Sequence, residues 1–273
     1  MQLGIFAKTF AGSSAEVVLG AAARAGFAAV QYNMACSGIG ALPVAVSDAV
    51  AGAVRRASEV TGVTVAAVSA TYNMIHPDMA VREAGRRSFA AIAAQAGAMG
   101  TQVVTVCSGS ADAADQWRHH PDNRAPAAWA QMMAEFAHLV EIAERQDVLI
   151  GVEPELANVV DGAVSARRLL DSIGSERVRI VLDPANLAEA VSVGERRRII
   201  AGAVDLLADR LVMAHAKDRD AAGGFATAGK GVVDFPHFVG CLRAVGFDGA
   251  MVTHGLAEDE APGAAAYLKG LLS

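Results

Sequence analysis

The sequence predicts an α/β protein that folds as a single (β/α)8 barrel, a TIM barrel, across residues 1–273. Three observations predict this fold. Short β-branched runs alternate with longer alanine-rich runs eight times from one end of the chain to the other. Most of the short runs are apolar up to their last residue, which is typical of parallel strands covered on both faces. No linker or change in composition divides the chain, and its length suits one barrel domain.

Each expected strand precedes a segment with helical features. The strands are expected at residues 2–6, 29–33, 64–69, 102–107, 148–153, 179–183, 211–215 and 250–254. Among the segments between them, 79–98 and 126–146 have clear helical periodicity, which places Val81 and Phe89 on the buried face of the first. Four helical segments are expected to stop at a glycine in the left-handed conformation, namely Gly26, Gly62, Gly100 and Gly246.

The composition excludes several classes of protein. With 53% hydrophobic and 19% charged residues, the chain is globular and not disordered. A net charge of −6 leaves no basic surplus to neutralise phosphates, so nucleic acid is not an expected partner. Three cysteines form neither a disulfide framework nor a metal knuckle. Because no signal sequence or membrane-spanning stretch is present, we expect no membrane partner and a cytoplasmic location.

Ionisable side chains stand where the last four apolar strands end. They are Glu153, Asp183, His215 and His254. The carboxyl ends of adjacent barrel strands converge, so we expect these four to surround one divalent metal ion. Two carboxylates and two imidazoles favour Mn²⁺, with Co²⁺, Fe²⁺, Zn²⁺ or Mg²⁺ as alternatives.

Each of the four residues also has a purely structural interpretation. Asp183 precedes a proline and is a candidate helix N-cap, and Glu153 is a candidate partner for an arginine. His215 and His254 are each candidates for a hydrogen-bonded core histidine. The position of all four on consecutive strands favours the metal.

Several strings resemble the sugar phosphate isomerase/epimerase family, the xylose isomerase-like branch of TIM barrels, which includes inosose dehydratases, ketose 3-epimerases and endonuclease IV. The strings are NMIHPD (73–78), GVEPE (151–155), VLDPAN (181–186), AHAKD (214–218), GKGVVDF (229–235) and GFDGAMVTHG (246–255). The resemblance implies a metal held by Glu, Asp, His and Glu on strands five to eight. Glu153, Asp183 and His215 match the first three, whereas His254 stands where the family has glutamate.

That difference bears on the reaction. The resemblance implies that ketose 3-epimerases use two metal-bound glutamates as bases on opposite faces of the substrate. An imidazole whose lone pair binds the metal cannot accept a proton, so His254 disfavours two-base epimerisation. The sequence therefore predicts a metal-dependent isomerase or lyase that removes the proton α to the carbonyl of a sugar, keto-sugar or cyclitol. A ketose 3-epimerase and a non-catalytic sugar-binding barrel are the alternatives.

The remaining candidates lie on the same face of the barrel. Either Glu153 or Glu155 is expected to take the proton, while Lys217 donates one and His254 completes the catalytic group. Two long connections, 108–125 and 216–234, follow strands four and seven, where barrel active sites lie. The expected substrate-binding residues are His76, Trp117, His120, Asn186, Asp218 and Lys230.

Four further expectations follow. Gly229-Lys230-Gly231 hints at a phosphate site, and Cys107 is expected to be a small buried residue and not a nucleophile. The endonuclease IV activity is not expected, because the sequence lacks the additional zinc-binding motifs that the resemblance implies for that branch. The resemblance also implies a homodimer or homotetramer.

Overall fold

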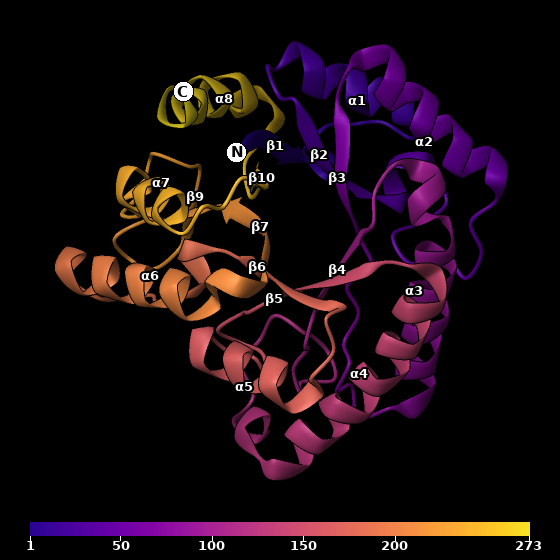
Figure 1. Cartoon of the computed structure of the whole chain (residues 1–273), viewed down its shortest axis with the longest axis vertical. Helices are drawn as coiled ribbons and strands as arrows, with labels where there is room; N and C mark the ends of the chain where they lie inside the picture. The colour runs from indigo at the N-terminus through magenta and orange to yellow at the C-terminus, as the bar shows by residue number, and fades with distance from the viewer.

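The computed structural model describes residues 1–273, and eight parallel strands close into the predicted barrel (Figure 1). Around the barrel the strands follow the order β1-β10-β7-β6-β5-β4-β3-β2, and β1 pairs with both β10 and β2. The strands are β1 (Gln2–Phe6), β2 (Ala29–Asn33), β3 (Thr64–Ser69), β4 (Val103–Cys107), β5 (Leu149–Glu153), β6 (Val178–Leu182), β7 (Leu211–Ala216) and β10 (Ala250–Thr253). Every strand lies within one residue of its predicted position at each end.

Eight helices form a ring outside the strands (Figure 1). They are α1 (Ala15–Arg24), α2 (Asp48–Thr61), α3 (Met79–Met99), α4 (Pro126–Gln146), α5 (Ala163–Ile173), α6 (Val193–Leu207), α7 (Phe235–Ala244) and α8 (Ala261–Leu272). All four predicted stop glycines have positive φ angles. Gly62 and Gly100 are the C-cap residues themselves, and Gly26 and Gly246 lie one residue beyond their caps. No helix is long and apolar enough to cross a membrane.

One predicted core position is wrong. Phe89 on α3 is fully buried, but Val81 in the first turn of the same helix is 41% exposed. Val81 borders a hollow in the surface and so has no neighbour to cover it. The helical period identifies a face, but it does not tell whether the barrel covers that face along its whole length.

A small apolar cluster lies inside the barrel, made by Ala67, Val181, Met213 and Val252. Glycine suits the positions beside it, because a Cβ at Gly4 or Gly151 would lie only 3.0 Å from a valine methyl group, which would have to move. The main core of 65 residues includes most of the apolar side chains that the helices bury. The polar residues at the carboxyl ends of the strands therefore lie next to a densely packed floor.

Two long connections lie at these carboxyl ends, as predicted. The connection after β4 contains the short turn η3 (Pro121–Arg124). The connection after β7 contains an antiparallel pair that the sequence analysis did not predict, formed by β8 (Asp218–Arg219) and β9 (Phe225–Ala226). This pair carries Phe225 over the ammonium of Lys217, with Nζ 4.1 Å from the ring centroid. The second connection therefore covers part of the site.

Candidate metal centre

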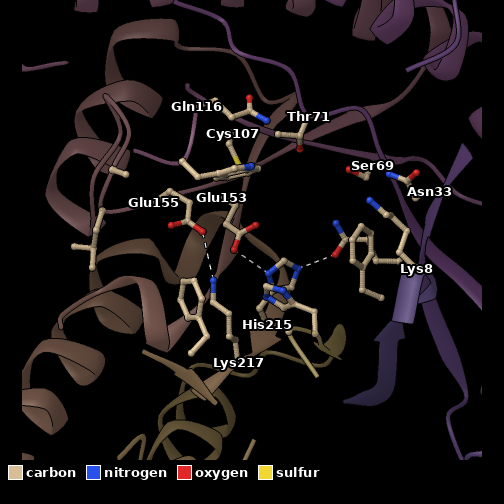
Figure 2. A pocket seen from close by; sticks show the side chains of 18 of the residues that line it. Lys8, Asn33, Ser69, Thr71, Cys107, Gln116, Glu153, Glu155, His215 and Lys217 are labelled. Atoms are coloured by element: carbon tan, nitrogen blue, oxygen red, sulfur yellow. Dashed lines mark hydrogen bonds and ion pairs between the residues drawn. The ribbon is translucent and has the colours of Figure 1, made fainter. Parts of the chain in front are cut away.

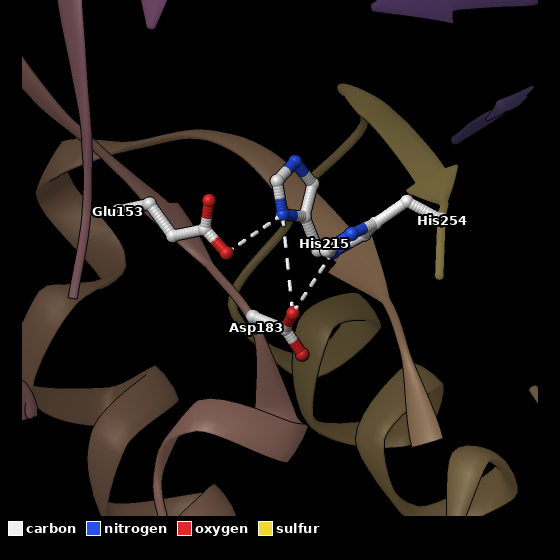
Figure 3. A group of neighbouring side chains, drawn as sticks. All are labelled: Glu153, Asp183, His215 and His254. Carbon is white, nitrogen blue, oxygen red and sulfur yellow. Dashed lines mark hydrogen bonds and ion pairs between the residues drawn. The ribbon is translucent and has the colours of Figure 1, made fainter. Parts of the chain in front are cut away.

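The four predicted ligands converge on one point (Figure 3). One ligand atom from each of Glu153, Asp183, His215 and His254 lies within 4.8 Å of the other three. Glu153 ends β5 and His215 belongs to β7, while Asp183 and His254 directly follow β6 and β10. This group of side chains, the ligand cluster, could hold one metal ion.

Each carboxylate oxygen of Asp183 contacts a different group. Oδ1 accepts a hydrogen bond at 2.9 Å from the backbone N–H of Ala185, which caps the turn η4 (Pro184–Asn186). Oδ2 lies 3.1 Å from Nε2 of His254 and 3.9 Å from Nδ1 of His215. The N-cap interpretation is therefore correct, and it leaves the second oxygen facing the ligand cluster.

The two ring nitrogens of His215 have different partners. Nε2 lies 2.7 Å from Oε1 of Gln31, and Nδ1 lies 3.0 Å from Oε1 of Glu153. Gln31 is held in turn, because its amide donates to Oγ1 of Thr105 at 3.0 Å. In the neutral imidazole, the acceptor at Nε2 keeps the proton on that nitrogen, so Nδ1 presents its lone pair to a metal once it has lost its own proton. Histidine ligands in metal sites are commonly oriented in this way, and the arrangement fits a bound ion.

Charges within the ligand cluster act on one another. Burial opposes ionisation of Glu153, but His215 outweighs it and the pKa of Glu153 is lowered. Burial likewise opposes protonation of His215, yet Glu153 raises the pKa of that imidazole. The pKa of His254 is lowered by burial and by His215, and Lys217 keeps the pKa of buried Asp183 low. Both carboxylates are therefore ionised at neutral pH, as metal binding requires.

A second ionisable group lies beside the ligand cluster. Nζ of Lys217 is 3.4 Å from Oε1 of Glu155 and 3.5 Å from Oδ2 of Asp183. The amide of Asn186 donates to Glu155 at 2.6 Å and to Glu153 at 3.0 Å, and so joins the two groups. Burial raises the pKa of Glu155 to about 7, although Lys217 opposes this shift. The carboxylates around Lys217 outweigh its burial and raise the pKa of its ammonium.

A cavity of about 700 Å³, here called the main cavity, is lined by Glu153, Glu155, His215, Lys217 and His254 (Figure 2). Its lining includes five polar residues from the region of β1 to β3 that the sequence analysis missed, Lys8, Gln31, Asn33, Ser69 and Thr71. Asn33 and Ser69 are the last residues of two predicted strands. An amide or a hydroxyl at the end of a barrel strand could therefore have identified them as candidate site residues. Cys107 also lines this cavity, and burial raises its thiol pKa well above the usual value, which argues against a nucleophile.

The structure separates the six predicted substrate-binding residues. Trp117 lines the main cavity, and Asn186 lies buried beneath it as the bridge to Glu153 and Glu155. His76, His120 and Lys230 do not line this cavity. His76 contacts the backbone carbonyl of Ala113, His120 caps η3, and Lys230 pairs with Glu260 at 2.7 Å. Local loop contacts hold these three side chains outside the main cavity, and His76 borders the same surface hollow as Val81.

Asp218 is fully buried and has a structural contact in place of the expected substrate contact. Its carboxylate accepts hydrogen bonds of 2.9–3.0 Å from the backbone N–H groups of Gly229, Gly231 and Val233. The amides suggested as a phosphate site therefore already bind a carboxylate of the protein itself. The glycines of Gly229-Lys230-Gly231 thus allow the loop backbone to bind Asp218, and this contact closes the loop.

Comparisons with known proteins agree with this architecture. Residues 19–271 match the profile of a family described as xylose isomerase-like TIM barrel. The 3-keto-D-glucoside 4-epimerase of E. coli has a TM-score of 0.78 and 18% identity, over 100% of this chain and 99% of that one. A D-psicose 3-epimerase from Clostridium cellulolyticum H10 has a TM-score of 0.77 and 14% identity, over 100% of both chains.

An L-ribulose 3-epimerase has a TM-score of 0.77 and 17% identity, over 99% of this chain and 94% of that one. At these identities the similarity is one of fold. A search of curated proteins found no match.

Proposed function

The chain belongs to the xylose isomerase-like TIM barrel family, and on that premise we propose that it is a divalent-metal-dependent sugar isomerase or lyase. The enzyme removes the proton α to the carbonyl of a sugar, keto-sugar or cyclitol. One observation carries this proposal: the pair of Glu155 and Lys217 lies beside the ligand cluster, and three of the four ligands line the same cavity as this pair. The structural neighbours are sugar epimerases, which supports a carbohydrate substrate.

Glu153, Asp183, His215 and His254 would hold the ion, with Mn²⁺ as the first expectation for this mixed oxygen and nitrogen set. When bound, the ion supplies Lewis acidity that stabilises negative charge on the oxygens of the substrate. Two features support the fit: Gln31 fixes the orientation of the His215 ring, and Asp183 directs its uncapped oxygen into the ligand cluster.

Glu155 is the proposed base. A general base works best when its pKa lies close to the working pH, and burial raises the pKa of Glu155 to about 7. The hydrogen bond from Asn186 fixes the carboxylate of Glu155 beside the ligand cluster. Glu153 shares this amide donor but faces His215, so it serves better as a ligand than as a base.

Lys217 is the proposed acid. Its ammonium stays protonated at neutral pH because the surrounding carboxylates raise its pKa. It lies between Glu155 and Asp183, from where it can donate a proton to a substrate oxygen or to a leaving hydroxyl. Phe225 covers it from the loop side and limits the access of water.

A ketose 3-epimerase is the second candidate function. Two structural neighbours favour it, since both are 3-epimerases. His254 argues against it, because a second carboxylate base is required on the opposite face of the substrate. A non-catalytic sugar-binding barrel would have no use for the pair of Glu155 and Lys217 beside the ligand cluster.

Metal analysis and proton exchange test the proposed function together. The purified protein is expected to contain about one divalent ion per chain, and the ion-loaded protein is incubated in D₂O with ketoses, inososes and their phosphates. Deuterium at the carbon next to the carbonyl is the expected result. A protein that binds no ion, or that exchanges no proton with any member of the panel, would contradict the proposal.

A further inference from the structure

A second hollow of about 570 Å³ adjoins the main cavity, on the side of α3 and the β4–α4 connection. We call it the annex. Four residues line both spaces, namely Leu42, Thr71, Gln116 and Trp117. A ligand seated beside the ligand cluster can therefore extend past these side chains into the annex. The combined space is large for a single sugar ring, since a pocket of roughly 300–1,000 Å³ already encloses a drug-sized ligand.

Several polar side chains around the annex already have hydrogen-bond partners within the protein. The amide of Asn73 donates to a backbone carbonyl at 2.8 Å, and the hydroxyl of Ser88 donates to another at 2.9 Å. Both ring nitrogens of His76 are engaged, each at 3.0 Å from a backbone partner. Gln116 is the exception, since its buried Oε1 has no partner, but it lies where the annex meets the main cavity. The rest of the annex therefore offers few donors or acceptors to the hydroxyls of a second sugar.

Apolar side chains are what the annex exposes. Val44 is 67% exposed and Trp117 is 50% exposed, and Val81 and Leu42 face the same hollow. Large apolar side chains gathered at one place on a surface mark a binding site more often than the same residues scattered singly. Asp115 is the only acidic residue in the lining, and one of its oxygens accepts the backbone N–H of Trp117.

The far wall of the main cavity has the opposite character. Lys8, Asn33 and Ser69 line it, and Figure 2 shows their side chains grouped opposite Glu155. Nζ of Lys8, Nδ2 of Asn33 and Oγ of Ser69 have no hydrogen-bond partner in the protein, whereas Oδ1 of Asn33 accepts the N–H of Ala35. These free groups suit the hydroxyls of a sugar. The two connected spaces thus differ in polarity.

We propose that the substrate is a glycoside with an apolar, preferably aromatic, aglycone. The sugar lies in the main cavity against Lys8, Asn33 and Ser69, and the aglycone lies in the annex against Trp117 and Val44. This inference rests on the proposed function for the reacting end of the ligand. It adds that the chain distinguishes glycosides from free sugars by a contact remote from the ligand cluster.

The test compares two ligands that differ only in the aglycone. Methyl and 4-nitrophenyl 3-keto-glucosides are titrated into the metal-loaded protein by calorimetry, and quenching of Trp117 fluorescence by the nitrophenyl group is recorded in parallel. The aryl glycoside is expected to bind about tenfold or more tightly, because its ring removes apolar surface from water. The quenching is expected to disappear in Trp117→Phe.

Ala84→Phe fills the annex, which Ala84 lines without reaching the main cavity. This variant is expected to lose the preference for the aryl glycoside while its affinity for the methyl glycoside stays unchanged. Val60→Phe is the matched control, since Val60 is 82% exposed on α2 and lines neither space. The control is expected to keep the preference.

Three results would overturn the inference. They are equal affinity for the two glycosides, equal loss of both in Ala84→Phe, and a change of oligomeric state in Ala84→Phe by light scattering, which would mean that a second copy covers the annex. Failure of the proposed function looks different: the free ketoses, the inososes and both glycosides would then all fail to exchange a proton in D₂O. Binding is read without turnover, so the two failures are separable.

Discussion

Gln31 on β2 and His215 on β7 meet across the interior of the barrel, with Oε1 of Gln31 2.7 Å from Nε2 of His215. The two strands are not neighbours in the barrel. The contact therefore ties the ligand cluster to the opposite wall of the main cavity. It also determines which nitrogen of the ring is available to a metal.

Gln31→Met is expected to weaken Mn²⁺ binding by about 10- to 100-fold, the usual effect of removing the partner of a histidine ligand. Methionine has a similar length but no strong acceptor, so the imidazole loses its fixed orientation. Titration calorimetry measures the change. Gln95→Met on the outer helix α3 is the control and is expected to bind like the wild type. An unchanged Mn²⁺ affinity in Gln31→Met would show that Gln31 does not contribute to metal binding.

Asp183→Asn and Asp183→Ala are both expected to release the metal and abolish activity, because each removes the carboxylate that faces the ligand cluster. Asparagine can still accept the hydrogen bond from Ala185, whereas alanine cannot. Asp183→Ala should therefore be less stable than Asp183→Asn by about 1 kcal/mol, the usual value of an N-cap. Elemental analysis and urea unfolding of the chelated proteins measure the two effects. Activity in a metal-free variant would disprove the metal hypothesis.

The sequence predicted this ligand cluster well, and the reason is topological. Strand ends of a parallel barrel meet at one face, so four polar terminations of apolar strands had to converge. Asp183 shows that a structural role does not exclude a metal-binding one, since its two oxygens have different partners. Strand positions were equally predictable, because buried strands are apolar runs of typical length.

The directions of loop side chains were harder to predict, as His120, Lys230 and Asp218 illustrate. A position in a loop near the site does not fix the direction of a side chain. His120 caps a turn, Lys230 pairs with Glu260, and Asp218 binds backbone amides, all through local contacts that depend on the path of the loop. Gln31 was missed for a different reason: an amide within a strand carries no charge that would make it stand out.

Glu155→Gln and Lys217→Met are expected to keep the metal and to lower the turnover rate by roughly 10²–10⁴, the usual contribution of a positioned acid or base. Neither residue belongs to the ligand cluster, although both lie next to it. Bound metal and the rate of α-proton exchange are measured on the same samples. Loss of the metal from Glu155→Gln would instead assign Glu155 to the coordination shell.

His254→Glu is expected to keep the metal, because it restores the glutamate of the family pattern that the chain resembles. The wild type is expected to show little or no C3 epimerisation of free ketoses at saturating Mn²⁺, since His254 cannot serve as a second base while it binds the ion. Chromatographic separation of the epimers measures this. Efficient turnover by the wild type would favour the epimerase function over an isomerase or lyase.

Metal binding is expected to release about one proton per ion near pH 6.5, and the proton comes from His215. In the metal-free protein, Glu153 raises the pKa of His215 above its usual value, while the pKa values of Glu153, Asp183 and His254 are lowered. Affinity should therefore rise as the pH rises toward the pKa of His215 and level off above it. Calorimetry in buffers with different ionisation enthalpies counts the protons. A binding enthalpy independent of the buffer would contradict this assignment.

Asp218 gives the β7–α7 connection a modular character. Its buried carboxylate accepts hydrogen bonds from the backbone of Gly229, Gly231 and Val233, which fixes the C-terminal end of the loop to the barrel. These contacts do not involve the side chains of the residues between Asp218 and Gly229. Residues 220–228, which include Phe225 at the cavity, therefore form a segment that can be replaced, here called the cassette, between the fixed residues Asp218 and Gly229. Grafting or randomising this cassette offers protein engineers a way to retune substrate choice while the metal-binding scaffold stays intact.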